Sequence, residues 1–494
     1  MRLSDLIEGL SVVAVTGDTS REVSGIHFDS RLVEPGGVFF ALEGVSADGR
    51  DFIPQALERG AAAIVAKQAY GADTDAVWIE VPDAREAMGR SAANWWGNPT
   101  RDLPVIGITG TNGKTTTALI AHHLLESSLF RAGLVGTIEY RVGDEVRAAP
   151  HTTPEAPDLQ ALFREMVDAG CRAAVMEVSS HGLVQHRTTG VRFDVGVFTN
   201  LSQDHLDYHG SMEAYFGAKC LLFERMEQDG GTGVMIVNAD DRYGERLLKR
   251  RGWDLATVTF GQSAGADFQA SGIRSGFDGT QFQLRAKGRQ YLVRTPLIGL
   301  FNVYNTLAAL AASVSAGLNM REAIANLATC PQVPGRLERV EGLQTNYRVF
   351  VDYAHTPDAV RNVLETVRSL EPKRLITVIG CGGDRDRGKR PLMAQAAEKA
   401  SDYVILTSDN PRTEDPQQIL RDAETGFHGT RRETVEDRKA AIGRAIDLAG
   451  ERDIVVIAGK GHETYQEVNG VRHEFDDRKV AFGWMAAAAE KSKS

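Results

Sequence analysis

The chain has 494 residues, too many for one hydrophobic core, and a usual size of roughly 100–200 residues per domain predicts about three domains. Hydrophobic residues make up 42% and charged residues 25% of the chain, as in an ordinary globular protein. The formal net charge of -10 argues against a broad nucleic-acid-binding surface, which needs a basic field, so no nucleic-acid partner is expected.

The four cysteines lie far apart without a CxxC pair, which is typical of reduced thiols and not of a disulfide framework or a zinc site. The first residues, MRLSDLIEGL, include acidic side chains and lack the long apolar run of a signal peptide. No run of about 18 apolar residues is present, so no membrane insertion is expected. These features predict a soluble cytoplasmic protein, and we expect a monomer.

Short apolar runs alternate with helical patterns along the chain, which predicts an α/β protein with largely parallel sheets. In the first region, 1–100, strands are expected at 37–42, 62–66 and 76–81. The polar, proline-containing stretch 98–104 predicts a linker. We interpret this region as a small mixed α/β N-terminal domain.

The second region, 101–332, opens with a predicted strand at 105–108 that runs into a glycine-rich loop and a helical stretch beginning at Lys114. Further elements are expected as strands at 173–178, 194–198 and 233–237, a β-rich stretch at about 255–296, and helices at about 302–316 and 320–329. The sequence Pro-Gln-Val-Pro-Gly at 331–335 predicts the next break. A central domain with a parallel sheet follows from this pattern.

The third region, 333–494, repeats one design four times, an apolar strand followed by a polar loop. The strands are expected at 348–351, 375–379, 403–406 and 454–457, and the loops that follow end at His355, Arg385, Arg412 and Glu463. Ligands of open α/β sheets bind at the carboxyl ends of strands. The pattern therefore predicts a Rossmann-like domain whose four polar loops share one cleft.

The stretch 109–116, TGTNGKTT, has the composition of a phosphate-binding loop. Gly110 and Gly113 allow backbone N–H groups to face an anion, Lys114 can reach outer phosphates, and the Thr115 hydroxyl can bind Mg²⁺. Ile108 stands where the common GxxxxGK[ST] pattern has its first glycine. The alternative is a glycine-rich turn with a surface lysine, but strand, turn, Lys-Thr-Thr and helix coincide here. By itself the loop fits a kinase, a motor, a GTPase or a ligase.

Five further segments follow this loop in order: EVSSH at 177–181, NLSQDHLD at 200–207, LFNVYN at 300–305, PGRLE at 334–338 and DYAH at 352–355. Together they resemble the motifs of the Mur ligases, which extend the peptide of the bacterial cell-wall precursor. The resemblance covers nearly the whole chain. It implies a UDP-binding N-terminal domain at 1–100, a central ATP-binding P-loop domain at 101–332, and a C-terminal Rossmann-like amino-acid-binding domain at 333–494.

Within this family, FDSR at 28–31, HTTP at 151–154 and HGLVQHR at 181–187 resemble the enzyme that adds the third residue, and DNPR at 409–412 resembles its version for meso-2,6-diaminopimelate. The resemblance implies an ATP-dependent ligase that joins this amino acid to UDP-N-acetylmuramoyl-L-alanyl-D-glutamate in cytoplasmic peptidoglycan precursor synthesis. A substrate carboxylate attacks the γ-phosphate of ATP, and the amine then attacks the acyl phosphate. Because the first step joins two anions, it needs concentrated positive charge.

The resemblance implies that Lys114, Lys219 and His205 are catalytic and that Thr115, Glu177, His205 and Lys219 lie near Mg²⁺ or its waters. Lys219 is implied to carry a CO₂-derived carbamate, which requires a neutral amine that burial favours. The plainer alternatives are a snorkelling surface lysine at 219 and a strand-end carboxylate paired with a base at 177. His205 and His209, with Asp204 and Asp207, weakly suggest zinc.

The family's positions for substrates carry over residue by residue. For ATP they are Gly110, Thr111, Asn112, Gly113, Lys114, Thr115, Thr116, Asn302, Arg336 and Asp352. For the UDP-muramoyl dipeptide they are Phe28, Ser30, Val45, Ser46, Ala47, His151, Thr152, Thr153, Ser179, Gln185 and Arg187. His151 stands where the family often has asparagine, and Asn302 could equally cap a helix.

The far end of diaminopimelate carries a carboxylate and an ammonium group, which call for a cation and an anion in its pocket. The residues expected there are Arg385, Asp409, Asn410, Pro411, Arg412, Gly459 and Glu463. Arg412 can bind a carboxylate with two hydrogen bonds, and Glu463 is the natural anion. The alternative for 409–412 is an ordinary turn at a strand end.

Three rival functions remain open from the residues. A folylpolyglutamate synthetase would share the ligase core but not the N-terminal region or the DNPR loop. A phosphate-loop switch or motor would hydrolyse ATP without an acceptor amine. A non-catalytic nucleotide-binding module would not need so many charged side chains at four strand ends.

Overall fold

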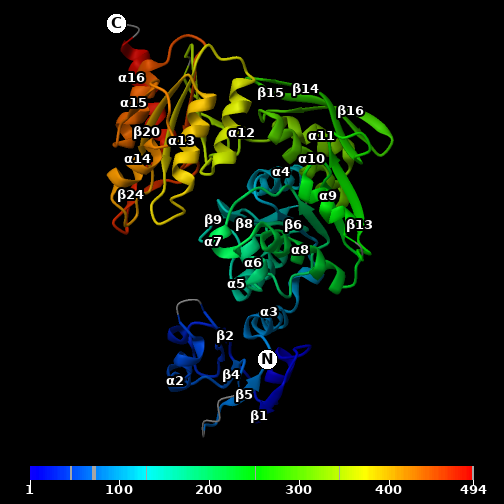
Figure 1. Ribbon diagram of the computed structural model, residues 1–494. Coiled ribbons are helices and arrows are strands. Elements are labelled where there is room, and N and C mark those ends of the chain that lie inside the picture. Colours follow the sequence, from blue (N-terminus) through cyan, green and yellow to red (C-terminus); the bar gives the residue numbers. More distant parts are fainter. Residues whose placement is uncertain (45–46, 69–73, 129–130, 251, 344, 492–494) are drawn as a thin grey trace.

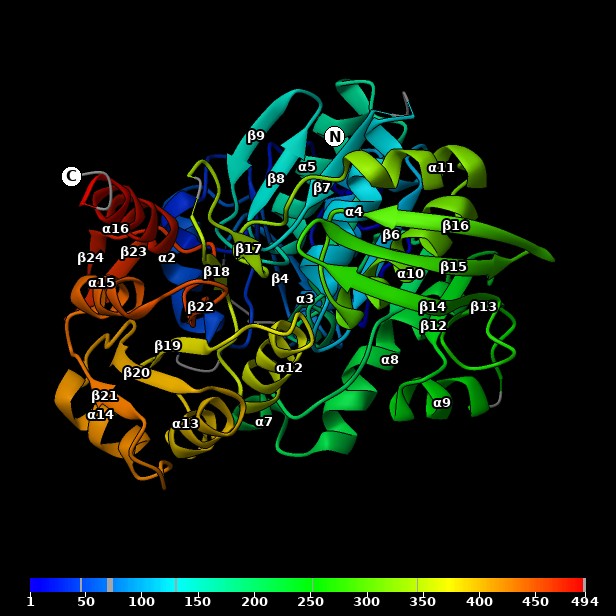
Figure 2. The ribbon, with the colours of Figure 1, turned by 90° about the horizontal axis from the view of Figure 1, so that it is seen from above.

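The computed structural model describes residues 1–44, 47–68, 74–128, 131–250, 252–343 and 345–491. They form three α/β domains, with the N-terminal domain at one end, the central domain in the middle and the C-terminal domain at the other end (Figure 1). Seen from above, the C-terminal domain lies beside the long strands of the central domain (Figure 2). The expected three-domain α/β architecture is confirmed.

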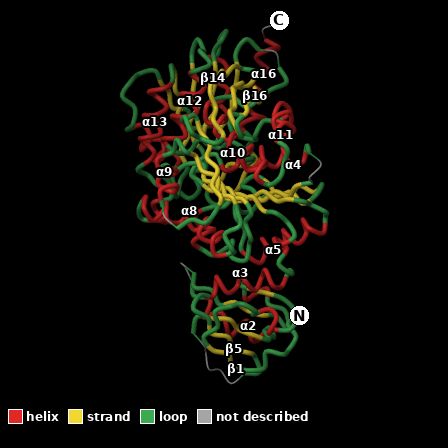
Figure 3. Tube along the Cα trace, turned by 90° about the vertical axis from the view of Figure 1, so that its right-hand side faces the viewer, coloured by secondary structure: helices red, strands yellow, loops and turns green. Residues whose placement is uncertain are grey.

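The N-terminal domain is built on a five-stranded sheet in the order β1-β5-β4-β3-β2. Its strands are β1 (Ala14–Thr16), β2 (Ile26–His27), β3 (Val38–Phe40), β4 (Ala63–Ala66) and β5 (Val77–Glu80), and only β1 is antiparallel to its neighbour. Its helices are α1 (Leu3–Leu6), α2 (Ile53–Glu58) and α3 (Ala84–Trp95), with short 3-10 turns at Ser30–Leu32 and Gly49–Phe52. Helix α3 lies on the side of this domain that faces the central domain (Figure 3).

The central domain has an 11-stranded sheet in the order β16-β15-β14-β13-β12-β11-β6-β10-β7-β8-β9. The parallel strands are β6 (Val105–Thr109), β7 (Ala132–Val135), β10 (Ala173–Glu177), β11 (Val195–Phe198), β12 (Val234–Asn238), β13 (Ala256–Gly261) and β14 (Phe268–Gly276). Antiparallel strands β8 (Glu139–Val142), β9 (Glu145–Ala148), β15 (Gly279–Ala286) and β16 (Arg289–Thr295) extend the two edges. The predicted strands at 105–108, 173–178, 194–198 and 233–237 are all present.

Two apolar helices hold the glycine-rich loop in place. Helix α4 (Lys114–Glu126) follows that loop, and α10 (Leu300–Ser315) packs against α4 and against β12, β13 and β14. Ile120, Leu124, Leu307 and Leu310 belong to their shared core and are fully buried. The remaining helices are α5 (Ala156–Asp168), α6 (Ser180–Val184), α7 (Leu206–His209), α8 (Met212–Gln228), α9 (Arg242–Lys249) and α11 (Met320–Asn326), with 3-10 turns at Pro99–Arg101 and Leu327–Thr329. Among the described residues, no helix is long and apolar enough to cross a membrane.

The C-terminal domain has a six-stranded sheet in the order β17-β18-β22-β19-β20-β21, in which only β17 is antiparallel. Its strands are β17 (Glu338–Arg339), β18 (Arg348–Asp352), β19 (Leu375–Cys381), β20 (Tyr403–Ser408), β21 (Arg432–Thr434) and β22 (Ile454–Ala458). Helices α12 (Pro357–Arg368), α13 (Lys389–Ala400) and α14 (Pro416–Glu424) cover one face, and α15 (Arg438–Leu448) and α16 (Asp477–Lys491) cover the other. A hairpin of β23 (Tyr465–Val468) and β24 (Val471–Glu474) stands apart from this sheet.

His122 on α4 makes the central domain sensitive to acid. The side chain is buried and its Nε2 lies 3.0 Å from the Ala132 carbonyl oxygen. Burial, helped by the charge of Arg141, lowers the pKa of His122 from 6.5 to about 4. The unfolded chain therefore binds more protons than the folded chain between these values, and stability falls as the pH falls through this window.

We expect His122→Gln to reduce this acid sensitivity while keeping a donor for the Ala132 carbonyl. Between pH 7 and pH 5 the wild-type protein should lose about 2 kcal/mol more of its unfolding free energy than the variant. Urea unfolding at the two pH values, followed by circular dichroism, measures the difference. Equal losses in the two proteins would show that His122 is not the group responsible.

Candidate active site

The loop between β6 and α4 requires glycine at two positions. Gly110 and Gly113 have φ values of +149° and +87°. A Cβ on Gly110 would lie 1.9 Å from Thr199 Oγ1, and one on Gly113 would lie 2.3 Å from Asn305 Oδ1. Asn200 holds the loop from the side, because its backbone oxygen accepts from Thr111 N at 2.9 Å and its side-chain oxygen accepts from Asn112 N at 3.0 Å. The loop is therefore compact and fixed before α4 begins.

Two lysines meet at one carbonyl of this loop. Lys114 Nζ donates to the oxygens of Gly110 and Thr111 at 3.0 and 2.9 Å, and Lys219 Nζ donates to the same Gly110 oxygen at 2.7 Å. Lys219 is 1% exposed and its ammonium lies 4.5 Å from the centre of the Tyr215 ring. Burial, and then the charge of Lys114, lowers the pKa of Lys219 well below its usual value. The site therefore favours a neutral amine at Lys219.

The carboxylate of Glu177 ends strand β10 beside the loop. It is buried and accepts from the Thr115 hydroxyl at 2.9 Å, from Thr137 N at 2.7 Å and from the Thr137 hydroxyl at 3.0 Å. Arg336 Nη2 donates to the Thr115 hydroxyl at 3.4 Å from the other side. Among the described residues, the hydrogen-bond partners of Glu177 are hydroxyls and a backbone amide, so the pairing with a base that the sequence left open is not observed. The carboxylate and hydroxyl oxygens gathered here are the type of ligand that Mg²⁺ prefers.

His205 lies at the start of α7 with a positive φ of 53°. Its Nε2 is 3.5 Å from Asp204 Oδ2, and its ring centre lies 5.0 Å from that of His181. Burial lowers the pKa of His205 to about 4, although Asp204 opposes this shift. His209 Nε2 is bound to the Ser180 hydroxyl at 3.0 Å. Among the described residues, no three His, Cys, Asp or Glu side chains are arranged to hold a metal ion, so the zinc alternative gains no support.

Most residues expected around ATP line one cavity of about 690 Å³ between the central and C-terminal domains. Its lining includes Thr111, Asn112, Gly113, Lys114, Thr115, Thr116, Glu177, His205, Lys219, Arg336 and Asp352. Gly110 is not in this lining, but its carbonyl receives the two lysines. Asn302 lies outside it, buried in α10, where its Nδ2 donates to the Ile298 oxygen at 2.9 Å. Gly299, and not Asn302, occupies the N-cap position of α10.

The residues expected around the muramoyl dipeptide line another wall of the same cavity. They are His151, Thr152, Thr153, Ser179 and Arg187, whereas Gln185 lies outside the lining and donates to the Tyr208 hydroxyl at 3.2 Å. Arg187 donates to the Thr153 oxygen at 3.0 Å and lies 3.0 Å from Glu155 Oε1. Arg187 therefore already has a carboxylate partner within the protein.

The residues expected around uridine lie in the N-terminal domain. Phe28 is exposed, Ser30 is buried and its hydroxyl donates to Gln55 Oε1 at 2.6 Å, and Ala47 lies in the loop after β3. Val45 and Ser46 fall outside the described residues. Phe28 and Ala47 follow the neighbouring parallel strands β2 and β3, so both lie at the carboxyl edge of that sheet. The cavity that the phosphate loop lines does not include them.

A second cavity, of about 1080 Å³, lies at the carboxyl ends of the C-terminal strands. Its lining includes Arg385, Asp409, Asn410, Arg412, Gly459 and Glu463, together with the segment 203–207 of the central domain. Pro411 belongs to the same turn but not to the lining. The loops after the four predicted strands therefore do share one cleft. Arg385 lines both cavities, so the two adjoin.

A buried network fixes the anion of this second cavity. Asn410 Nδ2 donates to Glu463 Oε2 at 2.8 Å, and Lys460 Nζ lies 2.9 Å from Asn410 Oδ1 and 3.3 Å from Glu463 Oε2. Burial, and then the neighbouring Asp409 carboxylate, raises the pKa of Glu463. A cationic ligand group would therefore relieve the repulsion between these two carboxylates.

Arg412 is held by its backbone. Its φ is +54°, its N–H donates to the Glu467 oxygen of β23 at 3.0 Å, and its Nη1 donates to the Gly383 oxygen at 2.6 Å. The β23–β24 hairpin thus supports the turn from outside the main sheet. The remaining guanidinium donors can face the cavity that Arg412 lines.

Known families match this chain along most of its length. Residues 22–96 match the catalytic domain of the Mur ligase family, 108–313 match the Mur ligase middle domain, and 335–461 match the Mur ligase glutamate ligase domain. The chain is 45% identical over 501 residues to UDP-N-acetylmuramoyl-L-alanyl-D-glutamate--2,6-diaminopimelate ligase of Geobacter sulfurreducens, covering 97% of this chain and 98% of that protein. This chain belongs to the Mur ligase family.

Other Mur ligases support this assignment. A protein of the same name from Geobacillus kaustophilus is 45% identical over 486 residues, covering 97% of this chain and 98% of that protein. A solved structure with that name is 36% identical, has a TM-score of 0.72, and covers 99% of both chains. The MurF ligase of Thermotoga maritima in complex with ADP has a TM-score of 0.63 at 20% identity over 95% of this chain and 97% of that chain, and shows the fold alone.

Several residues of this Mur ligase site were not singled out from the sequence. Thr137 binds Glu177, and Lys460 anchors Asn410 and Glu463. Lys460 could have been found, because it stands inside the polar loop that ends at Glu463. Thr137 carries no such signal, since its role depends on where β7 ends beside β10.

Proposed function

We propose that this Mur ligase joins meso-2,6-diaminopimelate to UDP-N-acetylmuramoyl-L-alanyl-D-glutamate with ATP, through an acyl phosphate. The observation that carries the proposal is that a cavity with a phosphate loop adjoins a cavity with paired cations and carboxylates, with Arg385 lining both. An activated carboxylate formed in the first cavity would then face an amine held in the second. The names of the full-length relatives agree with this reaction.

ATP would bind with its phosphates on the loop 110–116. The backbone N–H groups at the start of α4 and the Lys114 ammonium are suited to phosphate oxygens, and Arg336 lines the same cavity. To bind the phosphates, the Lys114 ammonium would give up its hydrogen bonds to the Gly110 and Thr111 carbonyl oxygens. Arg336 spans the domains, because its Nη2 donates to the Thr115 hydroxyl of the central domain at 3.4 Å while its guanidinium lies 4.8 Å from the centre of the Tyr353 ring in the C-terminal domain.

Mg²⁺ would be held by Thr115 and Glu177, with His205 near its waters and a carbamate on Lys219 supplying a further anion. The oxygen donors at 115 and 177 and the buried, readily neutral amine at 219 fit this group. When bound, the ion neutralises phosphate charge that otherwise repels the attacking carboxylate.

Diaminopimelate would bind with its far end in the second cavity. Arg412 and Arg385 receive the carboxylate, and Glu463 with Asp409 receives the ammonium group. Asn410, Pro411 and Gly459 shape this pocket. Lysine lacks the far carboxylate and would leave Arg412 without its partner, so the site should discriminate against it.

The uridine end of the nucleotide would bind the N-terminal domain at Phe28, Ser30 and the 45–47 loop, and the peptide would reach the cavity past His151, Thr152, Thr153, Ser179 and Arg187. The domain limits 1–100, 101–332 and 333–494 remain our prediction. We place the reaction in the cytoplasm, where ATP and UDP-linked precursors are available, and propose that a monomer performs it.

One assay tests the proposed function. The purified protein is supplied with ATP, Mg²⁺ and the UDP-muramoyl dipeptide, with diaminopimelate, with lysine or with no amine, and phosphate release and product mass are measured. We expect phosphate release and an amide product with diaminopimelate and little of either with lysine. Phosphate release that ignores the amine would refute the ligase function, whereas equal use of lysine would refute only the specificity.

A further inference from the structure

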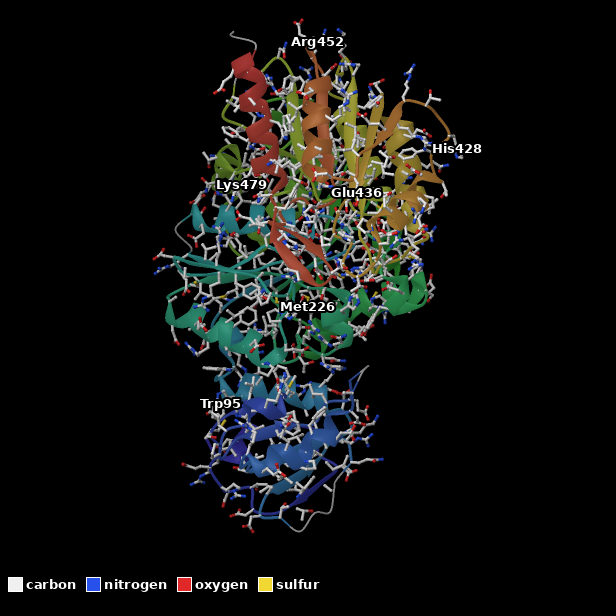
Figure 4. The ribbon with its side chains drawn as sticks, turned by 90° about the vertical axis from the view of Figure 1, so that its left-hand side faces the viewer. Trp95, Met226, His428, Glu436, Arg452 and Lys479 are labelled. Carbon is white, nitrogen blue, oxygen red and sulfur yellow. The ribbon has the colours of Figure 1, made fainter. Side chains whose placement is uncertain are left out.

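A fully buried arginine lies directly behind the diaminopimelate pocket. Arg438 begins α15, and its Nε and Nη2 donate to the two carboxylate oxygens of Asp477 at 2.8 and 2.7 Å. Both side chains are 0% exposed. Asp477 begins α16, so this ion pair joins the two helices that cover one face of the C-terminal sheet. Glu436 and Lys479, labelled in Figure 4, lie within two residues of Arg438 and Asp477.

The same guanidinium also holds two strand ends. Its Nη2 donates to the Ala458 oxygen at 3.0 Å and its Nη1 donates to the Ser408 oxygen at 3.4 Å. Ser408 ends β20 and Ala458 ends β22, and β19 lies between these two strands in the sheet. One side chain therefore bridges two strands that do not touch each other. The next residue after each strand end, Asp409 or Gly459, already lines the pocket.

Arg438 also faces the buried carboxylate of that pocket. Its Nη1 lies 3.9 Å from Asp409 Oδ2, an oxygen without a hydrogen-bond partner in the described part of the chain. The backbone after β22 also lies close to this oxygen, because a Cβ added to Gly459 would lie only 2.5 Å from it. Burial lowers the pKa of Arg438, but Asp477, followed by Asp409 and Glu463, outweighs burial and raises it. The arginine thus stays charged and offsets the two pocket carboxylates.

We propose that Arg438, oriented by Asp477, is a positioning residue that sets the spacing between the 409–412 turn and the 459–463 loop and thereby determines the affinity for diaminopimelate. The inference rests on the proposed function, because it assigns the two loops to the two charged groups of that substrate. Arg438 does not touch the substrate, since neither cavity includes it.

Only arginine has the geometry for this task. The planar guanidinium carries five donors, and four of them point at Asp477, Ala458 and Ser408. A lysine would keep the charge but could not reach two strand-end carbonyls and a bidentate carboxylate together. A buried carbonyl oxygen without a hydrogen-bond donor is costly. The loops after β20 and β22 would therefore shift until the Ser408 and Ala458 carbonyls find other donors.

The test compares Arg438→Lys with Arg374→Lys in the full-length protein. Arg374 precedes β19 and binds Asp453, which precedes β22, at the opposite edge of the same sheet, where its Nη2 lies 2.5 Å from the carboxylate. We expect Arg438→Lys to raise the KM for diaminopimelate by about tenfold or more, because one or two buried carbonyls lose their donor, with the KM for ATP nearly unchanged. Arg374→Lys should leave both constants near their wild-type values. Asp477→Asn, which keeps the shape of the partner, should act like Arg438→Lys but more weakly.

The possible outcomes separate this inference from the function on which it rests. A wild-type KM for diaminopimelate in Arg438→Lys would overturn the positioning role. Equal changes in the constants for diaminopimelate and ATP, together with a lower melting temperature, would also overturn it, because they indicate general damage. If wild-type protein and Arg374→Lys release no phosphate in response to diaminopimelate, the proposed function itself fails.

Discussion

Replacing Lys219 by alanine is expected to lower the rate of amide formation by roughly 100- to 1000-fold, the usual cost of removing one group that stabilises charge in a transition state. Lys219 lies fully buried beside the phosphate loop, with its Nζ 2.7 Å from the Gly110 oxygen. Burial makes its neutral form accessible, and only the neutral amine can take up CO₂ to form the carbamate that we propose as a ligand for Mg²⁺. Steady-state phosphate release under saturating substrates measures the effect.

Lys219→Met serves as the matched control for packing, because it fills nearly the same space without an amine. If it loses as much activity as the alanine variant while melting near the wild-type temperature, the amine and not the volume is essential. A carbamate should also give a ¹³C signal in wild-type protein prepared with ¹³C-bicarbonate, and this signal should vanish in both variants. Full activity in Lys219→Ala would remove this residue from the mechanism.

The second large effect is expected for Arg412→Ala. This change should raise the KM for diaminopimelate by roughly 100-fold, because the far carboxylate would enter a partly buried pocket without its bidentate partner. The KM for ATP should stay within about twofold, since the phosphate loop lies in the adjoining cavity. Arg412→Lys should fall between wild type and alanine, because lysine keeps the charge but loses the planar fork.

Arg387→Ala is the control for this experiment. Arg387 lies on the loop before α13, its side chain is 68% exposed, and it pairs with Glu414 without lining either cavity. We expect the KM values of Arg387→Ala for diaminopimelate and for ATP to match those of the wild-type protein. If Arg412→Ala leaves the KM for diaminopimelate unchanged, the 409–412 turn is not the recognition element.

The sequence predicted the sheet of the C-terminal domain well because its strands are short apolar runs buried on both faces. Each of the runs that became β18, β19, β20 and β22 is bounded by polar residues, and parallel strands place those polar ends at one edge. The same argument predicted that Arg385, Arg412 and Glu463 line one cleft, although they are far apart in the chain.

The contacts of individual side chains could not be predicted in this way. Nothing in the local pattern shows that Arg187 pairs with Glu155, that Asn302 turns inward to the Ile298 oxygen, or that Lys114 folds back onto its own loop. The β23–β24 hairpin was also missed, since its strands are short and mostly polar. Its support of Arg412 depends on tertiary placement, which residue pattern alone does not encode.

The proposed acyl phosphate can be tested by following one oxygen atom. The UDP-muramoyl dipeptide is prepared with ¹⁸O in the reacting D-glutamyl carboxylate and converted with ATP and diaminopimelate, and the released phosphate is analysed by mass spectrometry. When a carboxylate attacks the γ-phosphate, one carboxylate oxygen becomes the bridging oxygen of the acyl phosphate. Attack by the amine on the acyl carbon then releases phosphate that keeps this oxygen. We therefore predict one ¹⁸O per released phosphate. If the labelled dipeptide is converted to product and the released phosphate contains no ¹⁸O, activation of the carboxylate by ATP is contradicted.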